Sequence, residues 1–146
     1  MDPWSSWLPR IVACLMSTLS ELGDYLEGKS IGAPVVLGSM SDDPDTVVAL
    51  YEYPGGPPEY VQESQSPVAE VVQIQAVARA VAYQDASALI SRVWSALAVV
   101  TNMTLSGTKY RSVRPNNSPA VLRRDSNDRI LLFFNATVDK EVSLAS

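Results

Sequence analysis

The sequence contains no histidine and only one cysteine, Cys14, among its 146 residues. Without histidine, zinc sites of the Cys/His type and histidine-based acid–base catalysis are excluded, and one cysteine cannot form an intramolecular disulfide. A long uninterrupted hydrophobic run is also missing. The most apolar early stretch, residues 4–26, is broken by Arg10, Glu21 and Asp24, and no basic start followed by a small-residue cleavage site is seen. We therefore expect a soluble protein made in the cytoplasm, with no membrane partner and no cofactor.

The length and the charge set the next limits. A chain of 146 residues is enough for one hydrophobic core, and we expect a single domain over residues 1–146. Residues 1–70 carry 2 basic and 11 acidic side chains, a balance of −9, whereas residues 71–146 carry 9 basic and 5 acidic ones, a balance of +4. Uneven sampling of solvated surface explains this division as well as unlike patches do, but unlike patches suit head-to-tail contact between copies.

Hydrophobic periodicity predicts an α+β fold, with a single mixed or antiparallel β-sheet flanked by two main α-helices. Gly28 follows the first helix as a left-handed terminator, and one of the later strands runs from Leu105 to Pro115 and begins near a turn at Ser106 and Gly107. The expected order is a helix over residues 4–27, strands over 35–81, a helix over 83–100 and strands over 104–142.

The strand expected at residues 71–81 alternates cleanly between two kinds of side chain. Its even-numbered positions, from Val72 to Ala80, are apolar, and Ala76 and Ala78 among them are small. Gln73, Gln75 and Arg79 face the other way. The small residues predict a helix packed closely on the apolar face.

A loop rich in proline, glycine and tyrosine follows the strand that ends near Tyr53. The prolines fix φ and the glycines allow unusual backbone shapes, so the loop is shaped, and its tyrosine rings are of the kind enriched at interfaces. A plain surface turn between two strands is the equal alternative. The candidate contact residues are Tyr51, Tyr53, Pro54, Gly55, Gly56, Pro57, Pro58, Glu59 and Tyr60, with the loop itself over residues 54–60.

The basic part of the chain is a predicted hairpin over residues 115–129. Turn residues Asp125 to Asp128 join a short strand near Val121 to the last strand. Arginines here serve either solubility, with local pairs to Asp125 and Asp128, or a charged interface with the acidic half of a neighbouring subunit. Contact with phosphate is the weaker reading, because the chain is acidic overall. The candidate interface arginines are Arg114, Arg123, Arg124 and Arg129, with Arg111 nearby.

An acidic turn at Asp42, Asp43 and Asp45 is the only carboxylate cluster of note. A calcium loop needs regularly alternating ligands and a distal Glu, which are not found, so a solvated turn is favoured. A metal-dependent enzyme that also uses Glu52 and Glu59 is the weakest reading, because such a site also needs convergent geometry and supporting groups that the sequence does not indicate. Other enzyme classes are disfavoured because serine and cysteine nucleophiles lack a histidine partner and no glycine-rich phosphate cradle follows a strand. We expect no catalytic site and no metal site.

Several segments, taken in order, carry a family resemblance. They are the early helix, the run Val48–Tyr60, the strand Val72–Arg79, the helix holding Ala86 and Trp94, and the late segments Leu105–Arg114, Ser118 Pro119, Arg124 Asp125 and Phe133–Val138. Over about Leu8 to Lys140 the chain resembles the minor capsid proteins of long-tailed bacteriophages, and more narrowly their tail terminator. The Tyr Glu Tyr loop and the late Gly Thr x Tyr and Ser Pro segments are its most specific part. None of these motifs encodes chemistry, so the match rests on order and spacing.

The resemblance implies a structural virion protein, made in the host cytoplasm and located at the head-proximal end of the tail. There it would form a hexameric ring on the tail tube, end tube polymerisation and present a docking surface for the head completion or connector proteins. Genomic DNA would pass through the ring without sequence-specific contact. The alternative within the same virion is a head-to-neck connector or stopper, which binds the portal side.

Overall fold

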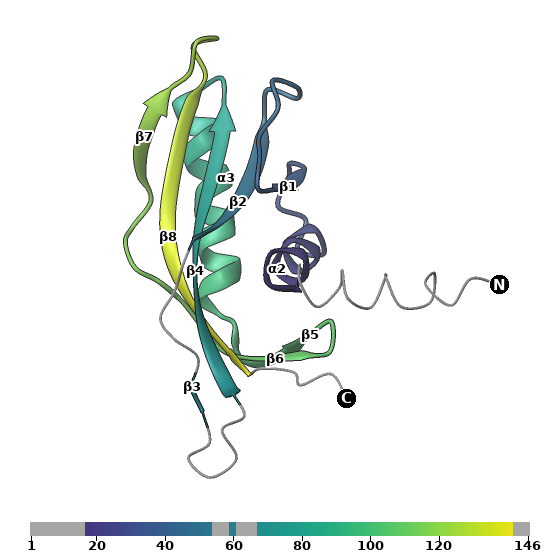
Figure 1. Ribbon diagram of the computed structural model, residues 1–146. Helices are drawn as coiled ribbons and strands as arrows, with labels where there is room; N and C mark the ends of the chain where they lie inside the picture. The colour runs from purple at the N-terminus through teal and green to yellow at the C-terminus, as the bar shows by residue number, and fades with distance from the viewer. Residues whose placement is uncertain (1–16, 54–58, 61–66, 142–146) are drawn as a thin grey trace, which may run out of the picture.

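The computed structural model describes residues 17–53, 59–60 and 67–141 (Figure 1). The order of helix, strands, helix and strands confirms the predicted α+β fold. The elements are α2 (Ser17–Glu27), β1 (Val35–Leu37), β2 (Val47–Tyr53), β3 (Glu59–Tyr60), β4 (Pro67–Ala80), α3 (Tyr83–Ala98), β5 (Thr101–Leu105), β6 (Thr108–Pro115), β7 (Ala120–Arg124) and β8 (Ile130–Glu141).

The sheet is built around a long antiparallel ladder between β4 and β8, which runs from Ala69 opposite Glu141 to Ala80 opposite Ile130. Two shorter strands, β2 and β3, pair with the outer side of β4, and β6 and β7 pair with the outer side of β8. β1 lies beyond β2 and β5 lies beyond β6, so these strands are at opposite sides of the sheet. Only β1 and β2 pair in parallel, which makes the sheet mixed.

The connection from β4 through α3 explains the order of the central strands. β4 and β6 both run antiparallel to β8, so they are parallel to each other on its two sides. Parallel strands need a crossover, and α3 with the β5–β6 hairpin supplies it. The C-terminal strand β8 then inserts between them. β8 is thus paired along both of its edges, and the apolar run from Ile130 to Phe134 matches a strand with little exposure on either face.

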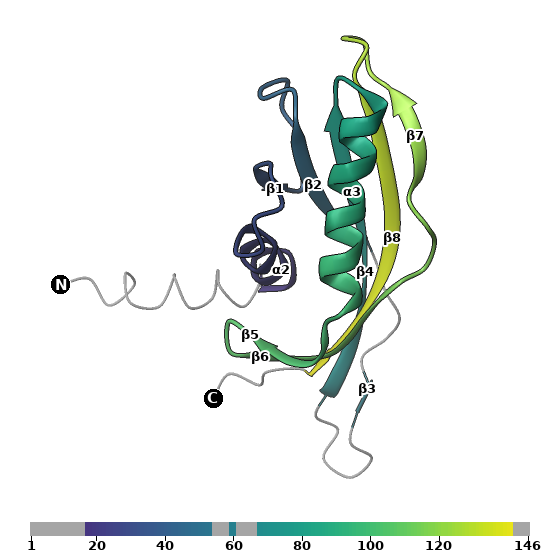
Figure 2. The same ribbon diagram turned by 180° about the vertical axis from the view of Figure 1, so that it is seen from behind.

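One face of the sheet carries the core. α3 lies across this face, behind the sheet in Figure 1 and in front of it in Figure 2, and the sheet curls so that α2 fits beside α3. The alternation predicted for residues 71–81 is confirmed, because the side chains of Val72, Ile74, Ala76, Ala78 and Ala80 are all buried. The three alanines let α3 approach the sheet closely, as expected.

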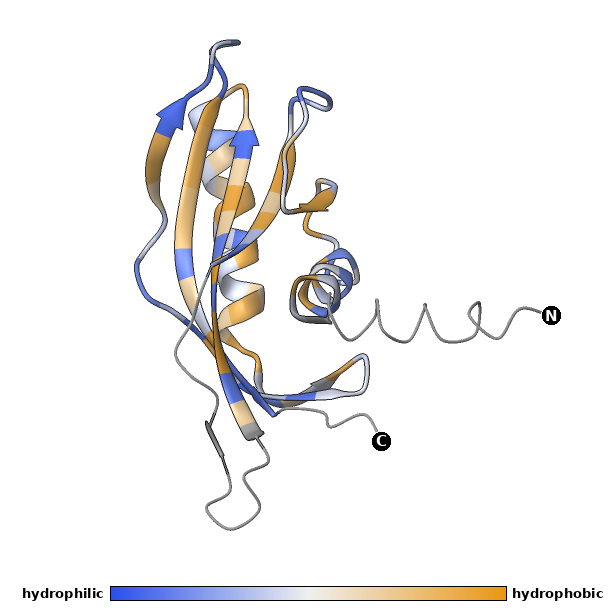
Figure 3. Cartoon of the chain, in the orientation of Figure 1, coloured by the Kyte–Doolittle hydropathy of each residue, from blue (hydrophilic) through white to orange (hydrophobic). Residues whose placement is uncertain are grey.

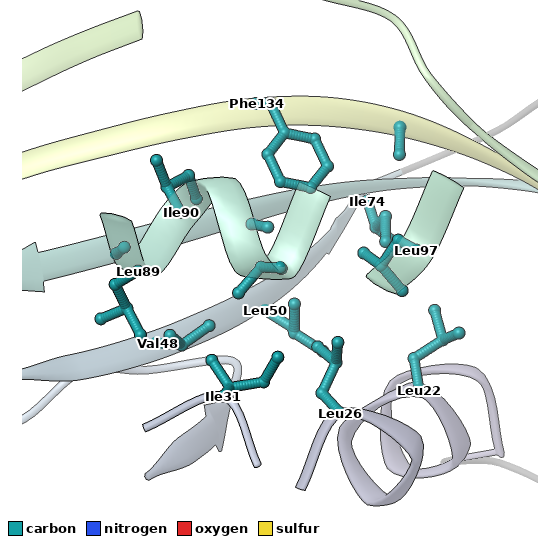
Figure 4. Close-up of a cluster of buried hydrophobic side chains, with 14 of the residues drawn as sticks. Leu22, Leu26, Ile31, Val48, Leu50, Ile74, Leu89, Ile90, Leu97 and Phe134 are labelled. Atoms are coloured by element: carbon teal, nitrogen blue, oxygen red, sulfur yellow. The ribbon is translucent and has the colours of Figure 1, made fainter. Parts of the chain in front are cut away.

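Side chains from both helices and from the sheet meet in one cluster. In Figure 4, leucines of α2 and of α3 point toward residues of β2 and β8 across the same interior. Figure 3 shows the matching pattern along the chain, with orange segments concentrated on the central strands and on the inner sides of the helices. The labelled members are Leu22, Leu26, Ile31, Val48, Leu50, Ile74, Leu89, Ile90, Leu97 and Phe134.

A buried polar cluster attaches α2 to the sheet. The carboxylate of Glu21, in α2, accepts hydrogen bonds from Thr108 Oγ1 and from the Tyr110 hydroxyl, each at 2.8 Å. Lys140 Nζ, from β8, donates to Thr18 Oγ1 one turn earlier in the helix. Burial of the Tyr110 ring, followed by its hydrogen bond to Glu21, raises the pKa of the phenol well above its usual value of 10.0.

Three details differ from the sequence expectations or lie outside the described residues. The part of the predicted helix before residue 17, and loop residues 54–58, are not among the described residues. Gly28 is not the left-handed terminator that was predicted, because Ser30 takes the positive φ, 54°, after α2. The stretch before the Ser106–Gly107 turn was not predicted as a strand; it forms β5, and the turn has φ values of 50° and 87° that suit a tight hairpin. None of the described helices is long and apolar enough to cross a membrane.

Candidate assembly surface

The structure divides the predicted contact residues between two sides of the central ladder. Tyr51 and Tyr53 lie on β2, next to β4, whereas Arg114 lies on β6 and Arg123 and Arg124 lie on β7, next to β8. The backbone of Glu59–Tyr60 forms β3, which pairs with the start of β4. Residues 54–58, the centre of the predicted loop, lie outside the described residues.

The sheet register nevertheless brings a tyrosine and an arginine into one row. Tyr53 is opposite Gln73, Gln73 is opposite Thr137, and Thr137 is opposite Arg114. Paired residues in neighbouring strands point to the same face, and this row alternates with the buried row that includes Ile74. Tyr53 and Arg114 therefore share the face opposite α3, and both are exposed. No helix of the described residues covers this face (Figure 1).

Two asparagines hold the connection between β6 and β7 against the sheet. The side-chain oxygen of Asn117 accepts a hydrogen bond from the backbone N–H of Asn135 at 2.9 Å, and Thr137 Oγ1 donates to Asn116 Oδ1 at 3.1 Å. From the opposite face, Trp94 Nε1 donates to the Asn117 carbonyl at 3.3 Å. These bonds place β7, and they were not predicted from the sequence. The adjacent Asn116 and Asn117 before a proline were the available signal for an ordered turn.

The β7–β8 hairpin turn is closed by one carboxylate. Asp125 Oδ1 accepts hydrogen bonds from the backbone N–H groups of Arg129, at 2.9 Å, and Asn127, at 3.0 Å. The backbone bond from Arg129 is the main reason that the pKa of Asp125 lies below its usual value. The local pairs that the sequence allowed are both present, at 2.8 Å between Arg129 and Asp125 and at 3.4 Å between Arg124 and Asp128.

Arg129 is buried, with only 3% of its surface exposed, and three carboxylates surround its guanidinium. Asp125 lies at 2.8 Å, Asp42 at 3.1 Å and Asp45 at 3.2 Å from its nitrogens. Burial lowers the pKa of this guanidinium, but the hydrogen bonds and charge of Asp125, Asp42 and Asp45 outweigh burial and raise it. Arg129 thus joins the hairpin to the acidic turn within one subunit. Arg114, Arg123 and Arg124 are the predicted interface arginines that remain candidates for contact with a neighbouring subunit.

A second buried arginine, Arg79 of β4, holds the backbone of the acidic turn. Its Nη2 donates to the carbonyl oxygens of Ser41 and Pro44, each at 2.6 Å, and its Nε donates to the Asp45 carbonyl at 3.2 Å. The acidic turn is exposed, as predicted for a solvated turn, and its backbone is held by two arginines on the helix-free face. Among the described residues, no group of three or more His, Cys, Asp or Glu side chains is placed to hold a metal ion.

Strand β7 is exposed along its whole length. All five of its residues are exposed, including Val121 at 53% and Leu122 at 41%. The register with β8 shifts between Val121 and Arg123, so Leu122 is an extra residue in a β-bulge. Within the described residues β7 pairs only with β8, and the side chains of Arg114 and Arg123 have no hydrogen-bond or ion-pair partner. This side of the sheet therefore presents apolar and cationic groups to solvent.

Comparison with known proteins identifies the family. The family model for the bacteriophage tail terminator protein matches residues 19–142, which include every described element from α2 to β8 except the first residues of α2. No curated protein sequence matches the chain.

A solved structure supports the fold independently. A chain from the virion of a native gene transfer agent particle superposes with a TM-score of 0.60 at 16% sequence identity, covering 85% of this chain and 94% of that one. A second solved chain, with a TM-score of 0.49 at 14% identity over 93% of this chain and 95% of its own, is too distant to add to the argument. Because the family model spans most of the sequence, the chain belongs to the bacteriophage tail terminator family and is a structural protein of the phage tail.

Proposed function

We propose that this protein forms a ring, hexameric as the family resemblance implies, at the head-proximal end of the tail tube. The ring ends polymerisation of the tube protein and presents a docking surface to the head completion or connector proteins. Its role is structural and involves no catalysis. The observation that carries this proposal is the family match over residues 19–142.

The exposed surfaces of the sheet support a ring-forming subunit. A closed ring of identical copies needs two different complementary patches on each subunit. The sheet has an exposed, cationic β7 on the β8 side and an acidic turn between β1 and β2 on the β4 side. We further propose that the helix-free face with Tyr51, Tyr53 and Arg114, together with loop residues 54–60, contacts the tube or a neighbouring subunit.

The charge of the chain suits a ring through which DNA passes. Non-specific DNA binding comes mainly from Lys and Arg contacts with phosphates, and each such contact slows release. This chain has a net charge of −5, and its two most central arginines, Arg79 and Arg129, are buried and bonded to the acidic turn. The net negative charge of the subunit therefore disfavours tight phosphate binding, as passage without sequence-specific contact requires.

The direct test is to mix the purified protein with tail tubes of the parent phage and to examine them by electron microscopy. Native mass spectrometry of the free protein, with and without tubes, gives the number of subunits. The proposal predicts six-fold rings on one end of the tubes and no further tube growth. Bare tubes, together with rings on portal-bearing heads, would instead assign the protein to the connector side. Binding to neither would refute both assignments.

A further inference from the structure

The β7 edge has the composition of a small protein–protein contact. We define the β7 patch as Val121, Leu122 and Arg123, all exposed; Val121 and Arg123 pair with Leu132 and Leu131, so they flank the free edge of β7 from its two faces. Figure 3 shows β7 as orange along its middle and blue at its end, so an apolar segment adjoins a charged one on the same strand. Arg123 has no partner within the described part of the chain, whereas Arg124 is already paired with Asp128. Natural proteins commonly protect an edge strand against pairing with other chains, and two adjacent exposed apolar side chains on an edge make it a candidate contact.

A complementary surface lies on the other side of the sheet. We define the acidic edge as Val36 of β1, Met40 and Asp43 of the following turn. The side chains of Val36 and Met40 are half-buried, and Asp43 is exposed. Asp42 and Asp45 are bonded to Arg129 and so fix the turn, but among the described residues no partner is found for the Asp43 carboxylate. The acidic edge thus offers an apolar strip beside one unpaired carboxylate.

The two surfaces lie at the same level of the molecule. Arg123 is opposite Leu131 in β8, Leu131 is opposite Arg79 in β4, and Arg79 is opposite Val47 in β2. Val47 comes two residues after Asp45, so one row of the sheet leads from Arg123 to the acidic turn. Figure 1 shows β7 on the left and β1 on the right of the central strands. The two patches therefore lie at one level along the strands, with β7 beyond β8 and β1 beyond β2.

We propose that the β7 patch of one copy of this chain packs against the acidic edge of the next copy, with Arg123 paired to Asp43 across the contact. This assignment rests on the proposed ring and names its subunit contact. The occupant is a second copy because the two surfaces are complementary. The cation of one meets the carboxylate of the other, and the two apolar strips pack together. The bulge at Leu122 interrupts the regular edge of β7, so the contact is made by side chains and not by continuation of the sheet.

Cysteine cross-linking tests the geometry directly. With Cys14 replaced by serine, Leu122→Cys is placed on the β7 patch and Ser41→Cys beside Asp43, and a short bismaleimide is added in the presence of tail tubes. The chain with both cysteines should give a ladder of covalent oligomers that stops at the ring size. Either single variant alone should stay monomeric, and a mixture of the two should give only dimers. Dimers from Leu122→Cys alone would mean a two-fold contact and would overturn the proposal.

Charge exchange tests the named pair. Arg123→Glu and Asp43→Arg should each weaken ring formation on tubes, and the double variant should restore it because the pair is re-formed with reversed polarity. A loss of roughly threefold per contact, typical of an exposed pair, compounds over six contacts to roughly 10²- to 10³-fold. Lys109→Glu, with the same change in charge on the exposed β5–β6 hairpin, is the matched control and should assemble normally.

The outcomes separate this contact from the ring itself. The wild-type protein could cap tubes while the chain with both cysteines gives no cross-linked oligomers and Arg123→Glu assembles normally. In that case the contact is wrongly assigned and the proposed function stands. If the wild-type protein does not bind tubes at all, both fall. Far-UV circular dichroism and melting curves matching those of the wild-type protein show that the charge variants are folded. Failure of the double variant to recover, with both single variants impaired, would refute the pairing of these two residues.

Discussion

Tyr110→Phe should destabilise the protein measurably, although it removes a single oxygen. The Tyr110 side chain is fully buried, and its hydroxyl donates to Glu21 Oε1 at 2.8 Å. Glu21 is itself 93% buried, so water does not replace the lost donor easily, and within the described residues Thr108 Oγ1 is the donor that remains for the carboxylate in α2. A hydrogen bond to a charged group contributes about 1.5–3 kcal/mol. At about 3 °C per kcal/mol for a domain of this size, the melting temperature should fall by about 5–9 °C.

The same substitution has a predicted pH dependence. The folded-state pKa of Tyr110 is raised above 10.0 by burial and by Glu21, so the neutral phenol is favoured in the folded protein. Its contribution to stability is present below the unfolded-state pKa and is lost as the pH rises above about 10 toward the folded-state value. The wild-type protein should therefore lose stability on the alkaline side more steeply than Tyr110→Phe does.

Urea denaturation followed by circular dichroism at pH 7 and across the alkaline range provides the assay. Tyr83→Phe is the matched control, because Tyr83 is 52% exposed and its loss should change the free energy of unfolding by less than about 0.5 kcal/mol. A double-mutant cycle with Glu21→Gln isolates the pair. If Tyr110→Phe stays within about 0.5 kcal/mol of wild type at pH 7, or if its alkaline limb matches that of wild type, the assigned role of this bond is wrong.

Three further predictions concern the core, the hairpin and two glycines. Phe134→Ala empties a fully buried site and should cost about 3–5 kcal/mol in urea denaturation, whereas a cost near 1 kcal/mol would mean that the site collapses around the change. The pKa of Asp125 is lower in the folded protein than in the unfolded chain, so the Asp125 carboxylate stabilises the fold above the unfolded value of 3.8, and this stabilisation is lost as the pH falls below it. Asp125→Asn should therefore make the free energy of unfolding less dependent on pH in the acid range. An unchanged pH dependence would count against this role. Gly107 has a φ of 87°, so Gly107→Ala should lower the free energy of unfolding by about 1–2 kcal/mol although nothing lies within 4 Å of the added methyl. Gly28 has no positive φ, so Gly28→Ala should be neutral or slightly stabilising. Equal shifts of the two melting curves would refute the conformational argument.

Local patterns predicted most of the elements. The alternation at residues 71–81 predicted β4, its buried alanines and a helix packed on them, because a strand shows its two faces in every second residue. The apolar spacing of residues 83–100 predicted α3, and the turn residues between Asp125 and Asp128 predicted the β7–β8 hairpin. Each of these signals is contained in a short stretch of chain.

The ends of elements were less well predicted. Gly28 is a typical helix-terminating residue, but its N–H still donates to the Asp24 carbonyl at 3.1 Å, as in a helix. The chain then continues into a turn, and Ser30 takes the left-handed conformation instead. Several neighbouring positions satisfy the local rules for a helix end, and packing of the following segment chooses among them. β5 was not predicted either, because Thr101–Leu105 becomes a strand only by pairing with β6.

The sequence by itself determined the α+β class, the division of charge and the family, since these follow from periodicity, composition and the order of segments. Tertiary structure alone decided what the charged residues do. The pairing of Arg129 with Asp42 joins residues 87 positions apart, and no local spacing specifies it. The same long-range register sets Tyr53 and Arg114 in one row, buries Arg129 and leaves Arg123 exposed. Side chains that look alike in the sequence thus take opposite roles, because burial and partners depend on which distant strands pair.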